Sequence, residues 1–142
     1  MPRQSQELFS PRGSTFQFLS DETEEFGGRG RAPDAVTYMS AGIAFCFMTQ
    51  LGRYAKITKK DLERYNLIQD AHFSSGGASG ATGQAGIADP IETHVCLTSS
   101  EGEDFARQCL DIGERTCFLH AFCRTELKTK ISLRPPIPKT VE

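Results

Sequence analysis

One apolar run restricts the fold more than any other part of the sequence. It reads SAGIAFCFMTQLGRYA, covers residues 40–55 and carries Cys46 near its centre. The spacing of apolar residues over 34–54 predicts a helix, and residues 41–48 are apolar on most of its faces. A helix that is apolar all round is expected to be buried all round. The sequence therefore predicts a long central helix that the other elements cover.

Stretches on both sides of this helix alternate in polarity as strands do. Strands are predicted over residues 14–20, 62–73, 91–99 and 126–133. The segment 21–33, between the first strand and the helix, is acidic and then glycine-rich, and it is predicted to be a loop. This order of elements indicates an α+β fold in which a β-sheet wraps one long buried helix.

Two further helices are predicted after the third strand. Ser99 or Ser100 followed by Glu103 resembles a capping box that opens the first of them. This helix is expected to end near Gly113, because glycine commonly follows the last turn of a helix. A second, short helix is predicted over 114–124.

Length and composition indicate one domain. A chain of 142 residues is long enough for a single core and too short for two comfortable domains. Residues 1–13 are predicted to be a flexible N-terminus, 14–133 the single domain, and 134–142 a proline-rich tail. Residues 74–86 are glycine-rich but lack the Lys-Ser/Thr ending of a phosphate-binding P-loop, so they are predicted to be a hairpin loop.

Charge and hydropathy argue against nucleic-acid and membrane partners. With 16 basic and 18 acidic residues the net charge is -2, which gives no attraction to nucleic acid or to an anionic membrane. The longest apolar stretch, 41–48, falls far short of the roughly 20 residues that a spanning helix needs. The N-terminus MPRQSQELFSPRGS lacks the apolar segment of a secretory signal. We therefore expect a cytoplasmic protein.

The cysteines are the candidate reactive residues: Cys46, Cys96, Cys109, Cys117 and Cys123. An odd number of cysteines without an export signal favours free thiols over a disulfide framework. No C-x-x-C occurs, and the histidine and cysteine spacings match no zinc site, so neither a metal nor another cofactor is predicted. The spacings considered are those of His94 with Cys96 and of His120 with Cys117 and Cys123.

Residue types alone leave two roles open for Cys46. A free cysteine is often buried simply as a small hydrophobic residue. It can instead be a redox thiol if a second cysteine lies within about 7 Å, measured between Cα atoms. Cys117 is a candidate partner because it lies at the start of the predicted short helix, where a thiolate is favoured. Cys109 has a core spacing with Phe105 and Ile112 and is predicted to be structural.

Parts of the chain resemble a protein family. They read FLSDETEEFGGRGRAPDAVTYMSAGIAFCF and THVCLTSSEGEDFARQCLDIGERTCFLHAF, and a closing strand follows them. The Gly-Gly loop, the proline and acid at a helix start, and the two cysteines in these contexts are similar to the OsmC/Ohr superfamily. That family is named after an osmotically induced protein and the organic hydroperoxide resistance protein. The resemblance covers residues 14–133.

The resemblance implies an OsmC-like fold and a thiol-dependent peroxidase that acts on organic hydroperoxides. Cys46 would be the peroxidatic thiolate, which is oxidised to a sulfenic acid. Cys117 would resolve that acid as a disulfide, and an external dithiol would reduce the disulfide. The resemblance also implies an intertwined homodimer with sites at the subunit interface. The alternative is a non-catalytic dimeric binding or redox-sensing domain with the same fold.

Two positions depart from the family pattern. Ohr-type enzymes carry a glutamate ten residues before the first cysteine, and this chain has Val36 there. Phe118 stands where a proline usually follows the second cysteine. That glutamate holds an arginine over the thiolate in Ohr-type enzymes, and a thiolate in apolar surroundings needs a positive partner.

The activating cation is therefore predicted to come from another part of the protein. Arg29 and Arg31 of the GGRGR segment are the first candidates, and we expect one of them to fold over the peroxidatic thiolate. Arg12 and the partner chain are the other sources. His120 follows Cys117 by one helical turn and is predicted to tune the pKa of that thiol.

Overall fold

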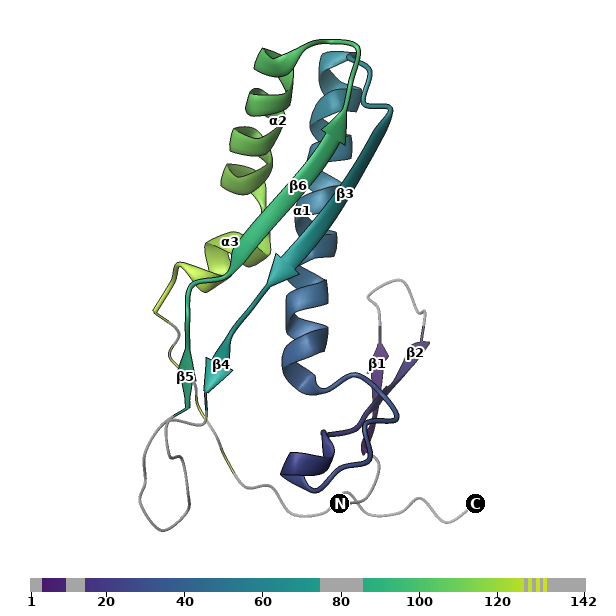
Figure 1. Ribbon diagram of the computed structural model, residues 1–142, viewed down its shortest axis with the longest axis vertical. Coiled ribbons are helices and arrows are strands. Elements are labelled where there is room, and N and C mark those ends of the chain that lie inside the picture. The colour runs from purple at the N-terminus through teal and green to yellow at the C-terminus, as the bar shows by residue number, and fades with distance from the viewer. Residues whose placement is uncertain are drawn as a thin grey trace.

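A long helix, α1, is the central element of the computed structural model, which describes residues 4–9, 15–74, 86–126, 128, 130 and 132 (Figure 1). α1 covers Ala35–Thr58, so the predicted helix is confirmed and extends further at its C-terminal end. Asp34 caps its first turn, because its Oδ1 accepts the N–H of Thr37 at 2.7 Å. Lys59 ends the helix in the left-handed conformation with φ 55, and its N–H donates to carbonyls of the last turn.

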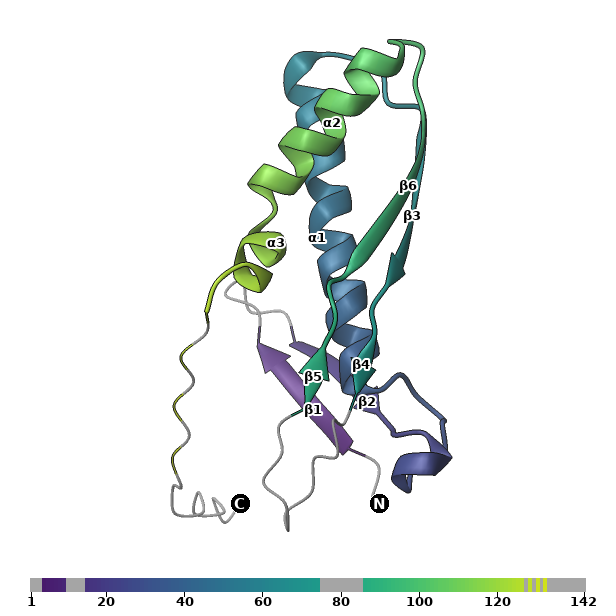
Figure 2. The ribbon, with the colours of Figure 1, turned by 60° about the vertical axis from the view of Figure 1, so that its left-hand side comes forward.

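A hairpin of two antiparallel strands runs alongside α1 (Figures 1 and 2). β3 covers Arg64–Asp70 and β6 covers Glu92–Thr98, with Leu67 opposite Val95. Side chains alternate between half-buried and exposed along both strands, as expected for a sheet with one face on a core. The second and third predicted strands are thereby confirmed, with β3 shorter than its predicted range.

Two short strands prolong this hairpin. β4 covers Phe73–Ser74 and β5 covers Ile87–Ala88, and the two are antiparallel. The predicted hairpin loop over 74–86 falls almost entirely outside the described residues, and the predicted strand over 126–133 falls partly outside them. The predicted tail over 134–142 lies wholly outside them.

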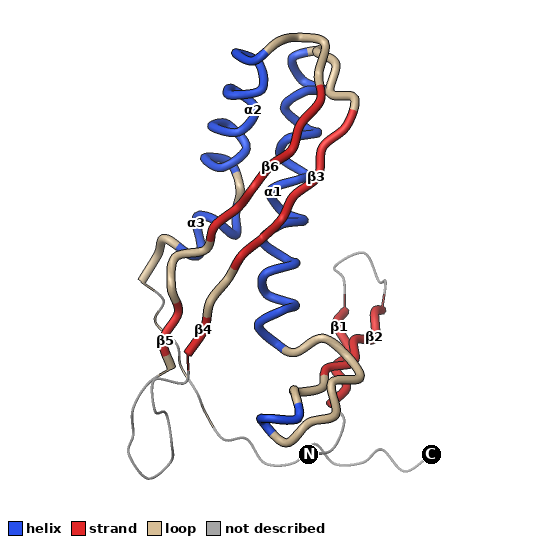
Figure 3. The backbone as a smooth tube through the Cα atoms, viewed as in Figure 1, coloured by secondary structure: helices blue, strands red, loops and turns tan. Residues whose placement is uncertain are grey.

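A separate strand pair lies near the N-terminal end of α1 (Figure 3). β1 covers Gln4–Phe9 and pairs antiparallel with β2, Thr15–Ser20, which confirms the first predicted strand. β1 lies within residues 1–13, where the sequence predicts no strand, because its order comes from backbone pairing with β2 and its polar composition gives no sign of it. The Tyr38 hydroxyl donates to the Leu19 carbonyl at 2.8 Å and so joins β2 to α1.

Two helices follow the hairpin. α2 covers Glu103–Thr116 and lies beside α1, and α3 covers Phe118–Cys123 (Figure 2). Both predicted helices are confirmed, but the predicted capping box is wrong. Gly102, with φ 85, is the N-cap of α2. The Ser99 hydroxyl instead donates to the Asp61 carbonyl at 2.6 Å, which fixes the connection between α1 and β3 to the loop after β6.

Gly113 lies inside α2 and not at its end. A Cβ atom at this position would lie 2.7 Å from Leu51 Cδ2 and 2.8 Å from Phe47 Cε2. The absence of a side chain therefore lets α2 approach α1 closely. The prediction that the helix ends near Gly113 is wrong, because this glycine serves packing and not helix termination.

The core lies where α1, α2 and the hairpin meet, and the α+β fold class is confirmed. Half-buried residues of β3 and β6, among them Leu67 and Val95, pack against it. Cys109 is fully buried, in line with its predicted structural role. The buried residues of the core cluster are Phe47, Leu51, Ala55, Phe105, Cys109 and Cys117.

Parts of the α1 surface are left uncovered by the described residues. Phe45 is 66% exposed and Ile57 is 68% exposed. The expectation of burial all round is therefore wrong for the single chain. α1 is also long and apolar enough to cross a membrane, but the core helix of a soluble protein meets the same criteria, so this is weak evidence for a membrane.

Candidate active site

α1 and the junction between α2 and α3 bring Cys46 and Cys117 together. Cys46 lies in the middle of α1, and Cys117 is the residue between the other two helices. The Cys117 side chain is one of the groups that lower the pKa of the Cys46 thiol, so the two side chains are neighbours, and both cysteines are free thiols. Two cysteines that are far apart in the sequence therefore form a contacting pair, as the redox hypothesis requires.

The surroundings of Cys46 favour its thiolate. Burial raises the pKa of the Cys46 thiol, but hydrogen bonds outweigh that cost, and the pKa is lowered. The backbone N–H of Leu119, the Cys117 thiol and the backbone N–H of Phe118 all donate to the Cys46 sulfur. Donors aimed at a sulfur stabilise its charged form over its neutral form. Cys46 is therefore the member of the pair that ionises more readily.

The surroundings of Cys117 favour its neutral thiol. Its pKa is raised chiefly by burial, and Cys117 is only 1% exposed. The backbone N–H groups of His120 and Leu119 oppose this effect, whereas the adjacent Cys46 sulfur adds to it. The neutral Cys117 thiol can donate a hydrogen bond to Cys46, so Cys46 is the thiol that loses its proton at the lower pH.

The chain folds in this way because α2 stops one residue before α3 starts. The Cys117 N–H donates to the Glu114 carbonyl at 3.3 Å, and the Cys117 carbonyl accepts from the Ala121 N–H at 3.0 Å. The first N–H groups of a helix have no partner within that helix. The N–H groups of Phe118, Leu119 and His120 are therefore free to bind sulfur, and they do so.

His120 contributes to the site through its backbone. Its ring packs edge-on against Phe47 with centroids 5.2 Å apart, and within the described structure its buried Nδ1 has no hydrogen-bond partner. Burial is the main reason that the pKa of His120 is lowered. The side chain is thus a neutral packing element. The backbone N–H, not the imidazole predicted above, acts on Cys117.

Arg29 and Arg31 lie in the loop before α1. The Asp21 carboxylate accepts the Arg31 N–H at 3.1 Å and the Arg29 N–H at 3.3 Å, and these bonds lower the pKa of Asp21, that with Arg31 most. Cys46 lies three turns along α1, roughly 16 Å from its start at about 1.5 Å per residue. Among the described arginines, none is a cause of the Cys46 pKa shift. This chain alone therefore does not bring the two predicted arginines to the thiol, and Arg12 lies outside the described residues.

A family model matches the part of the chain that forms this fold and contains both cysteines. The family model for OsmC-like proteins matches residues 28–132, which include both cysteines. This chain belongs to the OsmC-like family. Comparison with curated protein sequences gives no match.

Solved structures share the OsmC-like fold. An organic hydroperoxide resistance protein OsmC from Legionella pneumophila has a TM-score of 0.64 and 16% identity, over 87% of this chain and 90% of that one. A protein of the same description from Elizabethkingia anophelis has a TM-score of 0.60 and 15% identity, over 87% and 89%. A putative organic hydroperoxide resistance protein from Vibrio cholerae, with captopril bound in one active site, has a TM-score of 0.59 and 19% identity, over 85% and 84%.

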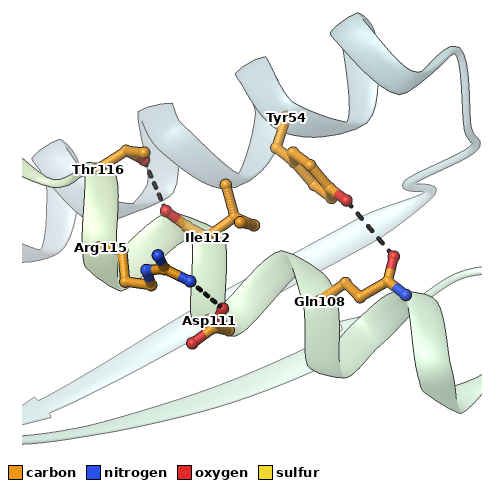
Figure 4. Close-up of polar contacts among 6 residues, drawn as sticks. All are labelled: Tyr54, Gln108, Asp111, Ile112, Arg115 and Thr116. Carbon is orange, nitrogen blue, oxygen red and sulfur yellow. Dashed lines mark hydrogen bonds and ion pairs between the residues drawn. The ribbon is translucent and has the colours of Figure 1, made fainter.

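A groove of about 480 Å³ opens beside Cys117 in this OsmC-like chain. It lies between α1 and the α2–α3 segment. Figure 4 shows part of its α2 wall, where Ile112 and Arg115 project, together with Tyr54 of α1. The groove is lined by Gln50, Arg53, Tyr54, Ile57, Ile112, Arg115, Thr116, Cys117, Phe118 and Ala121.

Sequence reasoning misses the polar residues of this groove. Gln50 and Arg53 follow Cys46 by about one and two helical turns, which places them on the same side of α1. Gln50 is only 8% exposed, and its Oε1 lies 3.5 Å from the Thr116 hydroxyl, which donates to the Ile112 carbonyl at 2.7 Å. The detectable signal is the position of these two polar residues, directly after the apolar run 41–48 and on the Cys46 side of the helix. Arg115 has no such signal, because its place depends on how α2 packs.

The other three cysteines of this OsmC-like chain are not among the causes of the Cys46 or Cys117 pKa shifts. Cys96 and Cys123 are exposed, and burial raises the pKa of the fully buried Cys109. His94 lies on β6, 3.3 Å from the Asp70 carboxylate. A search of the described residues finds no group of three or more metal-ligating side chains.

Proposed function

We propose that this OsmC-like protein reduces organic hydroperoxides through the Cys46–Cys117 pair. The observation that supports this most is the set of donors around the Cys46 sulfur: two backbone N–H groups and the Cys117 thiol. A thiolate is the nucleophilic form of cysteine, and these donors favour it. The same geometry holds a second thiol in contact with the first, where it can react next.

The reaction takes place in two steps on the protein. The Cys46 thiolate attacks the terminal oxygen of the hydroperoxide, the O–O bond breaks, and the alkoxide leaves and takes up a proton as the alcohol. Cys46 becomes a sulfenic acid. The sulfur of Cys117, after loss of its proton, attacks the Cys46 sulfur, forms the disulfide and expels hydroxide, which leaves as water.

An external dithiol returns the protein to its reduced form. Its two sulfurs give up two electrons and two protons, and the Cys46–Cys117 bond is replaced by two thiols. The Vibrio cholerae protein with captopril bound in one of its active sites supports access of a small molecule to a site of this fold. Relatives described as organic hydroperoxide resistance proteins support the choice of peroxide.

We also propose that the protein acts as a homodimer in the cytoplasm. The exposed apolar side chain of Phe45, in the middle of α1, belongs to a surface that a second copy can bury. A partner chain is also a source for the cation that the described residues do not bring to Cys46. The net charge of -2 gives no reason to expect nucleic acid as a partner.

The test is consumption of cumene hydroperoxide with dithiothreitol as the donor. Wild-type protein is expected to turn over many times, and Cys46→Ser is expected to lose all activity. Cys117→Ser should consume one equivalent of peroxide per thiol and then turn over more slowly. Cys96→Ser is the matched control, because Cys96 is exposed and lies apart from the pair. Wild-type activity in Cys46→Ser would contradict the proposal.

A redox-sensing domain is the second candidate, and Val36 at the usual glutamate position favours it. A sensor would form the Cys46–Cys117 disulfide with peroxide but would show no multiple turnover with any dithiol donor. The same assay distinguishes the two, because disulfide formation and steady-state turnover are measured separately.

A further inference from the structure

The position of α3 decides how its backbone meets Cys46. α3 covers only Phe118–Cys123 and is joined to α2 by a single residue, Cys117, whose backbone is extended with φ -74 and ψ 118. An extended residue between two helices breaks the helical path, so α3 does not continue the axis of α2 (Figure 2). The orientation of α3 therefore depends on contacts that its side chains make with the other two helices.

Two contacts hold the first half of α3 on α1. A Cβ atom at Gly42 of α1 would lie 3.6 Å from Leu119 Cδ1, so Leu119 packs close to the α1 backbone there. The His120 ring packs edge-on against Phe47 of α1, with centroids 5.2 Å apart. Gly42 precedes Cys46 by one turn and Phe47 directly follows it. These contacts therefore place the start of α3 beside the thiol and leave its last turn to be fixed by α2.

An ion pair fixes the last turn of α3 to α2. Arg124, the C-cap of α3, donates through Nη1 to Glu114 Oε1 at 2.8 Å. This pair spans ten residues and crosses the break between the helices, whereas the other arginine–carboxylate pairs of α2 in the described structure join residues one turn apart. The Glu114 carbonyl also accepts the Cys117 N–H at 3.3 Å. Glu114 therefore contacts the chain just before α3 and again at its end.

We propose that the Glu114–Arg124 ion pair holds α3 in the orientation that directs the Phe118 and Leu119 backbone N–H groups at the Cys46 sulfur. Glu114 and Arg124 are then positioning residues, which act on the thiol through the backbone of α3. This inference rests on the proposed function only in taking Cys46 as the reactive thiol.

The groups that act on Cys46 support an effect of the ion pair through position. Burial raises the pKa of Cys46, and the groups that lower it are two backbone N–H groups of α3 and the Cys117 side chain. Neither Glu114 nor Arg124 is among the causes of this pKa shift. Burial lowers the pKa of His120, the other titratable group that α3 packs on α1, and keeps its ring neutral. The backbone of α3 is therefore the route by which the ion pair affects the thiol.

The test measures the alkylation of Cys46 by iodoacetamide over pH in Glu114→Gln and Arg124→Gln. Without the ion pair α3 is less firmly held, so the pKa of Cys46 should rise in both variants. Both side chains of the pair are about half exposed, at 56% and 52%, so at a pH below that pKa we expect alkylation to be about two- to fivefold slower. Peptide mapping identifies Cys46, and no peroxide is used, so the result does not depend on the proposed activity.

The direction of the shift distinguishes positioning from a direct electrostatic effect. If the two charges acted on Cys46 through space, loss of Arg124 would raise its pKa and loss of Glu114 would lower it. Positioning predicts a rise in both variants. Glu114→Arg combined with Arg124→Glu restores the pair with its charges exchanged and should return alkylation toward the wild-type rate. Arg115→Gln is the matched control, because Arg115 pairs with Asp111 within α2 and does not cross to α3.

Salt gives the same test without a substitution. Sodium chloride at about 1 M screens an exposed ion pair, so the wild-type protein should be alkylated as slowly as the single variants, and the variants should change little. This arm keeps the inference testable if a variant does not fold, which urea unfolding followed by circular dichroism shows.

Specific outcomes would overturn the inference. Opposite shifts in the two single variants would do so, because the charges would then act directly. Unchanged alkylation in both folded variants, or equal slowing in Arg115→Gln, would also do so. The proposed function fails separately: if Cys46→Ser keeps wild-type peroxide consumption, that function is contradicted, whereas the effect of the ion pair on the Cys46 thiol is still measured by alkylation.

Discussion

Cys46 and Cys117 affect each other's ionisation across the contact between α1 and the α2–α3 junction: Cys117 lowers the pKa of the Cys46 thiol, and Cys46 raises that of the Cys117 thiol. The two residues are therefore chemically unequal before any oxidant arrives. Cys46 receives donors and is biased toward the thiolate, whereas Cys117 is buried and is biased toward the thiol. This inequality gives each cysteine its role in the proposed reaction.

Replacing the donor at position 117 tests this relationship. Cys117→Ala removes the side chain that helps to lower the pKa of Cys46. The pKa of Cys46 should therefore rise, and at any pH below that pKa a smaller fraction of Cys46 should be thiolate. A hydrogen bond of about 1 kcal/mol corresponds to about a fivefold slower alkylation of Cys46 at such a pH. The rate of reaction with iodoacetamide is followed over pH, with Cys46 identified by peptide mapping.

Cys117→Ser is the matched control for that experiment, because its hydroxyl can still donate. Its Cys46 alkylation should stay closer to wild type than that of the alanine variant. Identical pH profiles for the alanine variant and the wild type would show that the Cys117 thiol does not set the Cys46 pKa.

Peroxide is expected to join Cys46 and Cys117 in preference to any other pair. Cys117 is the one cysteine among the causes of the lowered Cys46 pKa, whereas Cys109 is fully buried in the core and Cys96 and Cys123 are exposed. Non-reducing peptide mapping after one equivalent of cumene hydroperoxide should find this disulfide as the main product. A disulfide involving Cys123 as the main product would be evidence against the contact seen here.

Because α1 and α2 approach closely at Gly113, even a methyl side chain at this position is predicted to lower the stability of the protein. Gly113→Ala would place a Cβ 2.7 Å from Leu51 Cδ2, so overpacking should lower the free energy of unfolding by about 1–3 kcal/mol. Gly42→Ala is the matched control on α1, because its Cβ would lie 3.6 Å from Leu119 Cδ1, an ordinary contact.

The control should be neutral or stabilising, since alanine is better than glycine in a helix interior by up to about 1 kcal/mol. Urea unfolding followed by circular dichroism measures both variants. Equal stability of the two alanine variants would mean that α1 and α2 are not packed as closely as described.

Local patterns in the sequence predict most of the elements but not their contacts. Alternating polarity finds β2, β3 and β6, and the apolar run finds α1, because these signals come from neighbouring residues. Gly113 shows the limit of this reasoning: glycine is common both after helices and at close helix contacts, and only the packing of α2 on α1 distinguishes the two. Composition likewise gives no sign of β1, whose order comes from pairing with β2.

The candidate site divides in the same way. The sequence, through the family resemblance, predicts Cys46 and Cys117 as a pair, and the structure brings them together. Two of the groups that lower the Cys46 pKa are backbone N–H groups. Every residue but proline carries such a group, so the residue types in the sequence do not predict them. Arg29 and Arg31 are predicted from their charge alone, yet their backbone is bound to Asp21 in the loop before α1.

The uncovered face of α1 predicts a homodimer in solution. Phe45 is 66% exposed in the middle of this helix, and burying such a side chain against a second copy is favourable by about 1.5–3 kcal/mol. Wild-type protein should have the mass of a dimer in light scattering at micromolar concentration, and Phe45→Glu should shift it toward the monomer. Ile68→Glu is the matched control: Ile68 is 61% exposed, but it lies on the outer face of the hairpin among polar residues such as Asn66 and Asp70. A monomeric wild type, or a dimer that Phe45→Glu leaves intact, would show that a second copy does not cover this face.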